Sequence, residues 1–226
     1  MSTRSEFEKY AVKHRGISSN TLHQYANHLV TGMTPNIIEE RSLNVAVMDV
    51  YSRLMMDRII FLGYPINDEV ANIITAQLLF LDSADRSRDI NMYVNSPGGS
   101  VYAGLGIYDT MQFIKSPVST IVMGQACSMG SLLAQAGAEG KRYVLPNSRT
   151  MIHQPSGGAG GQATDMEIQV KEILEMKKYL TEIYEEHNSK GKTFEQLKAD
   201  MERDNFMNAQ EALDYGLVDE IVKNRD

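Results

Sequence analysis

The chain has 226 residues, 42% of them hydrophobic, a size that suits one sizeable α/β domain or two small ones. Its formal net charge of −7, with no offsetting basic stripe, argues against a nucleic-acid partner, and no apolar run approaches the ~20 residues that cross a bilayer. Cys127 is the single cysteine, which rules out an intrachain disulfide and fits a reducing compartment.

Residues 1–35 are polar and differ in composition from the rest of the chain. They contain no continuous apolar segment of the kind found in a secretory signal, so we expect a flexible or removable extension. His14, His23 and His28 also lie here. A metal cluster built from these histidines is the alternative, although their spacings match no common metal site.

Residues 36–155 show apolar runs alternating with segments of helical spacing. The expected strands are 58–66, 89–94, 118–123, 142–145 and 150–153, and the expected helices are 49–56, a segment capped by Asn67, 103–114 and 131–136. The helix after Asn67 is expected to bury Val70, Ile73, Ile74, Leu78 and Leu79. This alternation is typical of repeated βαβ units and predicts an α/β fold with a largely parallel sheet.

A glycine-rich loop over 156–162 precedes a long helical segment. Thr164 and Glu167 fit a capping box, which predicts that the helix opens there and continues to about His187. A helix of ~24 residues is ~36 Å long and would outrun a compact domain of this size. We therefore expect it to project and to bury its apolar stripe against another subunit, with packing on its own sheet as the alternative. The stripe contains Ile173, Met176, Leu180 and Ile183.

Two further helices and a closing strand are expected after this segment. Thr193 with Gln196, and Asn208 with Glu211, both satisfy the capping-box pattern. Gly216 ends the second helix, and 218–222 predicts a strand.

Ser128 lies where the 118–123 strand turns into a helix of small residues. Such a turn lifts a side chain out of the sheet and places it at the positive end of a helix dipole, which suits a nucleophile. An ordinary helix N-cap is the alternative. Gly98 and Gly99 also follow a strand, and the carboxyl ends of parallel strands meet at one edge of a sheet. We therefore expect the two turns to lie close together.

His153 is the candidate general base for Ser128, because an imidazole can accept a proton near neutral pH. Backbone N–H groups of the Gly98-Gly99 turn and of Met129 are candidate donors for an oxyanion. Spacing alone leaves the orienting acid open. The candidates are Asp165, Asp200, Asp204 and Asp219.

Four ordered blocks carry a resemblance to a known family: 95–99 (NSPGG), 124–130 (GQACSMG), 151–155 (MIHQP) and 202–206 (ERDNF). Over about residues 36–224 the chain resembles the ClpP family, the proteolytic subunits of the Clp protease. The resemblance implies a crotonase-like α/β fold and a serine endopeptidase. It implies Ser128 as nucleophile, His153 as general base and Asp204 as the orienting acid, with oxyanion donors at Gly99 and Met129.

The resemblance also implies an assembly and a partner. Residues 1–35 would be a propeptide, 36–226 the peptidase domain, and about 156–190 the handle that interlocks two stacked heptameric rings. A hexameric AAA+ unfoldase, ClpX-like or ClpA/ClpC-like, would thread unfolded proteins into the chamber, its loops received by apolar clefts on the outer ring face. The compartment implied is the bacterial cytoplasm.

The chain itself is expected to bind neither a metal nor a cofactor. It lacks the glycine-rich phosphate loop pattern G-x-x-x-x-G-K-[ST], so ATP would be used by the partner. Three alternatives remain beside the peptidase: Cys127 as the nucleophile, a non-catalytic ring subunit of the same architecture, and an acyl-CoA enzyme of the wider crotonase-like class.

Overall fold

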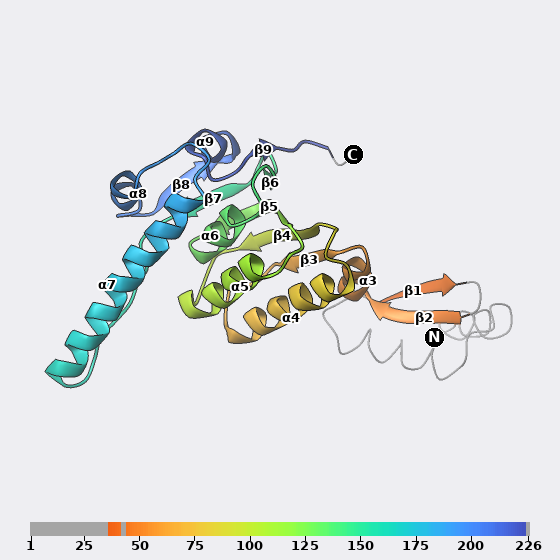
Figure 1. The fold of residues 1–226 in the computed structure, drawn as a ribbon, viewed down its shortest axis with the longest axis horizontal. Coiled ribbons are helices and arrows are strands. Elements are labelled where there is room, and N and C mark those ends of the chain that lie inside the picture. The colour runs from red at the N-terminus through yellow and green to blue at the C-terminus, as the bar shows by residue number, and fades with distance from the viewer. Residues whose placement is uncertain (1–35, 42–43, 225–226) are drawn as a thin grey trace, which may run out of the picture. The chain divides into compact units, whose positions relative to one another are not determined.

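The computed structural model describes residues 36–41 and 44–224, so the expected N-terminal extension lies outside the described residues. The chain divides between Asp57 and Arg58 into two compact units (Figure 1). In the first unit, β1 (Asn36–Arg41) pairs antiparallel with β2 (Asn44–Asp49), and α3 (Val50–Met56) follows. Asp49 caps α3 by accepting a 3.0 Å hydrogen bond from the Ser52 N–H, which confirms the helix expected over 49–56.

The second unit is built on a mixed sheet that is mostly parallel. The parallel strands run in the order β3 (Ile59–Leu62), β4 (Ile90–Ser96), β5 (Val118–Cys127), β6 (Arg142–Val144) and β9 (Glu220–Ile221). The far end of β5 also pairs in parallel with β7 (Arg149–Ile152), and β7 pairs antiparallel with β8 (Asn205–Asn208). The largely parallel sheet is confirmed, whereas β8 is not among the expected strands.

Helices α4 (Asp68–Ala84), α5 (Val101–Phe113) and α6 (Met129–Gln135) cover one face of this sheet (Figure 1). Alternate strand residues such as Met92, Val94 and Val122 are completely buried. The remaining helices are α7 (Ala163–Glu186), α8 (Phe194–Asp200) and α9 (Ala209–Tyr215). No helix in the described ranges is both long and apolar enough to span a membrane.

The prediction of which α4 residues are buried is partly wrong. Ile74 and Leu78 are buried as expected, but Ile73 and Leu79 are 52% and 45% exposed. The buried face instead follows Ala71, Ile74, Leu78 and Leu81. Each of the two exposed residues is next to a buried one in the sequence. Because successive side chains on a helix are ~100° apart, both exposed residues lie beside the buried face rather than on it.

Helix α7 has the expected length of 24 residues, but the Thr164–Glu167 capping box is wrong. The helix begins one residue before Thr164, and its N-cap Gln162 makes no side-chain hydrogen bond to it. Figure 1 shows α7 extending beyond the sheet. Leu180 and Ile183 near its C-terminal end are buried, whereas Ile168 is 64% exposed. The projecting helix is therefore confirmed, and its first half carries exposed apolar residues. Leu180 and Ile183 of the expected stripe instead pack within this chain, as the alternative has it.

The smaller C-terminal elements agree with their local signals. Both capping boxes form, Thr193 with Gln196 at α8 and Asn208 with Glu211 at α9. Gly216 ends α9 in the left-handed conformation expected of a glycine cap, with φ of 93°.

Candidate active site

Ser128 is the single residue between β5 and α6, and its backbone is strained. Its φ of 54° and ψ of −126° lie in a region that residues with a Cβ rarely adopt. The side chain does not cap α6, which argues against the ordinary N-cap alternative. A strained turn of this kind holds the hydroxyl at the N-terminal end of a helix, where a developing negative charge is favoured.

Hydrogen bonds on both sides hold this turn in place. The Ser128 N–H donates to the Met151 carbonyl at 2.9 Å, and the Ser128 carbonyl accepts from the Ser131 hydroxyl at 2.7 Å. The hydroxyl of Tyr184 in α7 lies 2.5 Å from the Ser131 hydroxyl and 3.2 Å from the Ser128 carbonyl oxygen. Burial raises the pKa of Tyr184, so the phenol stays protonated and can donate. These bonds offset the backbone strain.

His153 and Asp204 are brought together by the pairing of β7 with β8. Ile152 faces Asn205 in the antiparallel register, so the next pair along is His153 and Asp204. Nδ1 of His153 lies 2.8 Å from Oδ1 of Asp204. A carboxylate only accepts hydrogen bonds, which places the donated proton on Nδ1 and leaves Nε2 available to act as a base.

The other three candidate acids lie elsewhere. Asp200 accepts from the Tyr215 hydroxyl at 2.7 Å, and Asp219 forms an ion pair with the buried Arg142. Asp165 is exposed in the first turn of α7. Among the four candidate acids, Asp204 is the one whose carboxylate is hydrogen-bonded to the His153 imidazole.

Ser128 and His153 are neighbours through the sheet. β5 and β7 are parallel, with Cys127 beside Met151, so the chain after each strand places Ser128 close to the residues that lead into His153. No hydrogen bond joins the Ser128 hydroxyl to the imidazole in the described chain. Such bonds are often long in the absence of substrate and tighten when it binds.

The glycine turn lies directly against the Ser128 turn, as expected. A Cβ added to Gly98 would lie 2.7 Å from the Ser128 Cβ and 3.1 Å from the Met129 nitrogen. Gly99 pairs in parallel with Ile66, but its own N–H and carbonyl do not make the hydrogen bonds of this pairing. The Ile66 N–H donates to the Gly98 carbonyl, and the Ser100 N–H donates to the Ile66 carbonyl. The N–H of Gly99 therefore points away from Ile66. Met129 is the first residue of α6, where N–H groups have no intrahelical acceptor.

The environment of Cys127 is not that of a reactive thiol. It is buried, and burial raises its pKa, with the Asp204 charge adding to the effect. Since the thiolate is the nucleophilic form, this environment disfavours Cys127 as the attacking group. Within the described ranges, no cluster of three or more His, Cys, Asp or Glu side chains could hold a metal ion. His14, His23 and His28 lie outside those ranges.

Comparison with known proteins decides the family, because residues 41–225 match the family model described as Clp protease. The chain belongs to the Clp protease family. Named relatives are ATP-dependent Clp protease proteolytic subunits. That of Porphyromonas gingivalis is 57% identical over 222 residues, 98% of this chain and 99% of the relative. Those of Bacteroides fragilis and Bacteroides thetaiotaomicron are 56% and 55% identical over 217 residues, in each case 96% of this chain and 98% of the relative. The α/β fold is therefore that of a Clp protease.

Two residues that support the Ser128 turn are not among the expected ones. Ser131 lies three residues after Ser128, and this helical spacing is a signal that its hydroxyl could reach back to the Ser128 carbonyl. Tyr184 lies 56 residues beyond Ser128. Nothing in the spacing of the sequence points to it.

Proposed function

We propose that this chain is a serine endopeptidase subunit that hydrolyses unfolded proteins to small peptides, with Ser128, His153 and Asp204 as its catalytic residues. The observation that carries the proposal is the 2.8 Å hydrogen bond between His153 and Asp204, formed next to the strained turn at Ser128. The parallel pairing of β5 with β7 places the Ser128 turn beside the segment that leads into this pair, which supports a site built from all three residues.

Each group has a role that follows from its position. The Ser128 hydroxyl attacks the scissile carbonyl while Nε2 of His153 takes its proton and later passes that proton to the leaving amine. Asp204 holds the imidazole in the required tautomer and stabilises its cationic form. Water then hydrolyses the acyl-enzyme by the same route. The N–H groups of Gly99 and Met129 stabilise the oxyanion, each such donor contributing roughly 3–4 kcal/mol in comparable sites.

Substrate binding follows from the same glycine turn. One side of the Gly99 segment is paired with Ile66, and its other side presents the N–H group and carbonyl of Gly99. An extended peptide can add there as a further strand, which presents its carbonyl to the Ser128 turn.

Active-site labelling tests the proposal. A fluorophosphonate probe should modify Ser128, and Ser128→Ala should lose both labelling and peptide cleavage, whereas Ser156→Ala in the exposed glycine-rich loop should keep both. The absence of both labelling and peptide cleavage would favour a non-catalytic subunit, and thioester chemistry with no labelling would favour an acyl-CoA enzyme. Cleavage that survives in Ser128→Ala would overturn the assignment.

The assembly proposed is two stacked heptameric rings, with 156–190 as the handle between them. The exposed apolar residues in the first half of α7 support a helix that packs on another subunit. The partner proposed is a hexameric AAA+ unfoldase, ClpX-like or ClpA/ClpC-like, because the relatives are named ATP-dependent. ATP is then used by the partner, this chain binds no cofactor, and residues 1–35 are a propeptide. The compartment proposed is the bacterial cytoplasm.

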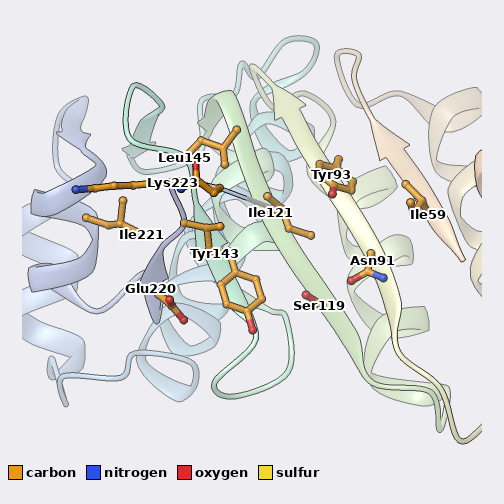
Figure 2. Close-up of a pocket in the computed structure, with 12 residues that line it drawn as sticks. Ile59, Asn91, Tyr93, Ser119, Ile121, Tyr143, Leu145, Glu220, Ile221 and Lys223 are labelled. Carbon is orange, nitrogen blue, oxygen red and sulfur yellow. The ribbon is translucent and has the colours of Figure 1, made fainter. Parts of the chain in front are cut away.

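A pocket on the sheet face opposite the helices suits loops from such a partner. It has a volume of about 1000 Å³ (Figure 2). Its lining includes Tyr93, Ile121 and Tyr143 from three adjacent strands, at positions alternating with the buried ones. Apolar side chains from a partner loop would replace water over this half-exposed surface.

A substitution in this pocket separates docking from catalysis. Ile121→Glu places a charge in the pocket, so we expect loss of ATP-dependent protein degradation in the presence of the unfoldase. Cleavage of short peptides should stay within about twofold, because the pocket lies on the face away from the helices, while the catalytic residues lie at the strand ends. Unchanged degradation of a folded protein would contradict the docking site.

A further inference from the structure

Lys177 of α7 contacts both loops that carry the His153–Asp204 pair. Its ammonium donates to the Gln154 side-chain oxygen at 2.6 Å and to the Glu202 carboxylate at 3.1 Å. Gln154 directly follows His153, and Glu202 lies two residues before Asp204. The Lys177 side chain is 23% exposed, so this contact is partly shielded from solvent.

Gln154 joins the same two loops a second time. Its backbone N–H donates to the Met201 carbonyl at 2.7 Å, and its side-chain amide donates to the Glu202 carbonyl at 2.8 Å. We call Lys177, Gln154 and Glu202 the loop clamp. Through it, one ammonium group and one side-chain amide tie the segment after β7 to the segment before β8.

The Asp204 loop needs such a tie. Asp204 is 60% exposed and precedes the first residue of β8, so the strand pairing alone does not enclose it. The hydrogen bond and charge of Lys177 lower the pKa of Glu202, which keeps that carboxylate ionised and able to accept at neutral pH.

We propose that Lys177 is a positioning residue, which holds the His153 and Asp204 loops in register and so links helix α7 to the catalytic pair. The inference rests on the proposed roles of His153 and Asp204. A small displacement of a catalytic pair can cost much of the rate, whereas the binding of a peptide along the Gly99 edge does not use the clamp.

Three variants test the role of Lys177. Lys177→Met removes both donated hydrogen bonds while keeping the length of the side chain, and Lys177→Arg keeps a cation that can donate to both partners. Lys178→Met is the matched control, because Lys178 is the next residue in α7, is 68% exposed and, among the described residues, pairs only with Glu182 in its own helix. The kcat and KM for an unstructured peptide, the rate of fluorophosphonate labelling and the assembly mass should be measured for all three.

We expect Lys177→Met to lower kcat and the labelling rate by about tenfold, with KM within about twofold and an unchanged assembly mass. Lys177→Arg should recover most of the rate, and Lys178→Met should match the parent. If Lys177→Met fails to assemble, Glu202→Gln tests the clamp from its exposed side and should lower kcat without raising KM.

A kcat within twofold of the parent in Lys177→Met, or an equal loss in Lys178→Met, would overturn the inference. An increase in KM with an unchanged kcat would also overturn the inference. His153→Ala separates this outcome from failure of the proposed function. If His153→Ala is inactive and Lys177→Met is normal, only the positioning role is lost, whereas an active His153→Ala would remove the catalytic assignment itself.

Discussion

At the scale of single residues, the site depends on how closely two backbone turns approach each other. Gly98 has a φ of 90°, and a Cβ there would lie 2.6 Å from the Cys127 carbonyl oxygen. That oxygen and the neighbouring Ser128 Cβ belong to the rigid turn that presents the nucleophile. Only glycine therefore fits both the conformation and the space.

Gly98→Ala should consequently lower kcat/KM for a short peptide by about 100-fold or more, since the added methyl group displaces the Ser128 turn from its oxyanion donors. Gly106→Ala is the control, because Gly106 is exposed in α5 and a Cβ there meets nothing within 4 Å. The measurement is steady-state peptide cleavage, with circular dichroism to verify the fold. Near-parental activity in Gly98→Ala would contradict the tight packing of the two turns.

The residue scale also shows what could be predicted from the sequence. Ser128, Met129 and the Gly98-Gly99 turn are indicated by strand-to-helix turns, because the local signals lie within a few residues of them, and the resemblance selects Gly99. The orienting acid could not be identified in this way, since four candidate aspartates lie after His153 and spacing cannot choose among them. Resemblance pointed to Asp204, and the structure shows why: the β7–β8 pairing, a long-range contact, sets it opposite His153.

At the scale of elements, the starts of α8 and α9 could be predicted from the sequence, whereas the pairing of β8 with β7 could not. The capping boxes of α8 and α9 are local, and both form. β8 is four residues long, with a burial pattern that includes the 61% exposed Phe206, so it lacks a clear alternation. β8 forms because it pairs with β7. The paired residues are separated by more than 50 positions in the sequence, so no local pattern predicts the pairing.

The contact between α5 and α7 predicts that the stability of the folded chain depends on pH. Nε2 of His187, at the C-terminal end of α7, lies 3.1 Å from the Tyr108 hydroxyl of α5. Burial lowers the pKa of His187, partly opposed by the Glu186 carboxylate. The unfolded chain therefore binds a proton more readily than the folded chain, so stability is full above about pH 6.5 and falls as the pH drops through that value.

Thermal midpoints of the inactive Ser128→Ala chain, taken between pH 7.5 and 5.5, measure this effect. The midpoint should decrease toward low pH, and His187→Gln, which cannot gain the proton, should show a flatter profile. His153→Gln is the comparison variant at the 25% exposed site histidine. A His187→Gln profile as steep as that of the parent would show that other groups control the acid response.

At the scale of the whole molecule, the exposed apolar residues of α7 indicate that the single chain is incomplete. Ile168 and Leu174 are 64% and 60% exposed on a helix that extends beyond the sheet (Figure 1). Met166 and Val170 are also exposed and, with Leu174, are spaced four residues apart, so they form one apolar row of the kind found at protein–protein interfaces. The handle proposed for the ring assembly gives these residues a place to pack.

Charges placed on this helix should therefore break the assembly before they unfold the chain. Ile168→Glu combined with Leu174→Glu would bury two unpaired carboxylates at the interface, each costing several kcal/mol, which is enough to reduce the assembly to smaller species. Native mass spectrometry of the double variant should show masses below that of the parent particle, together with a large loss of peptide cleavage. Lys198→Glu in α8 changes the net charge of the chain by the same total amount as the double variant, but on a different helix, and should leave the mass unchanged. A parental mass in the double variant, or full activity in a 25.3 kDa monomer, would contradict the role of α7 as the contact between subunits.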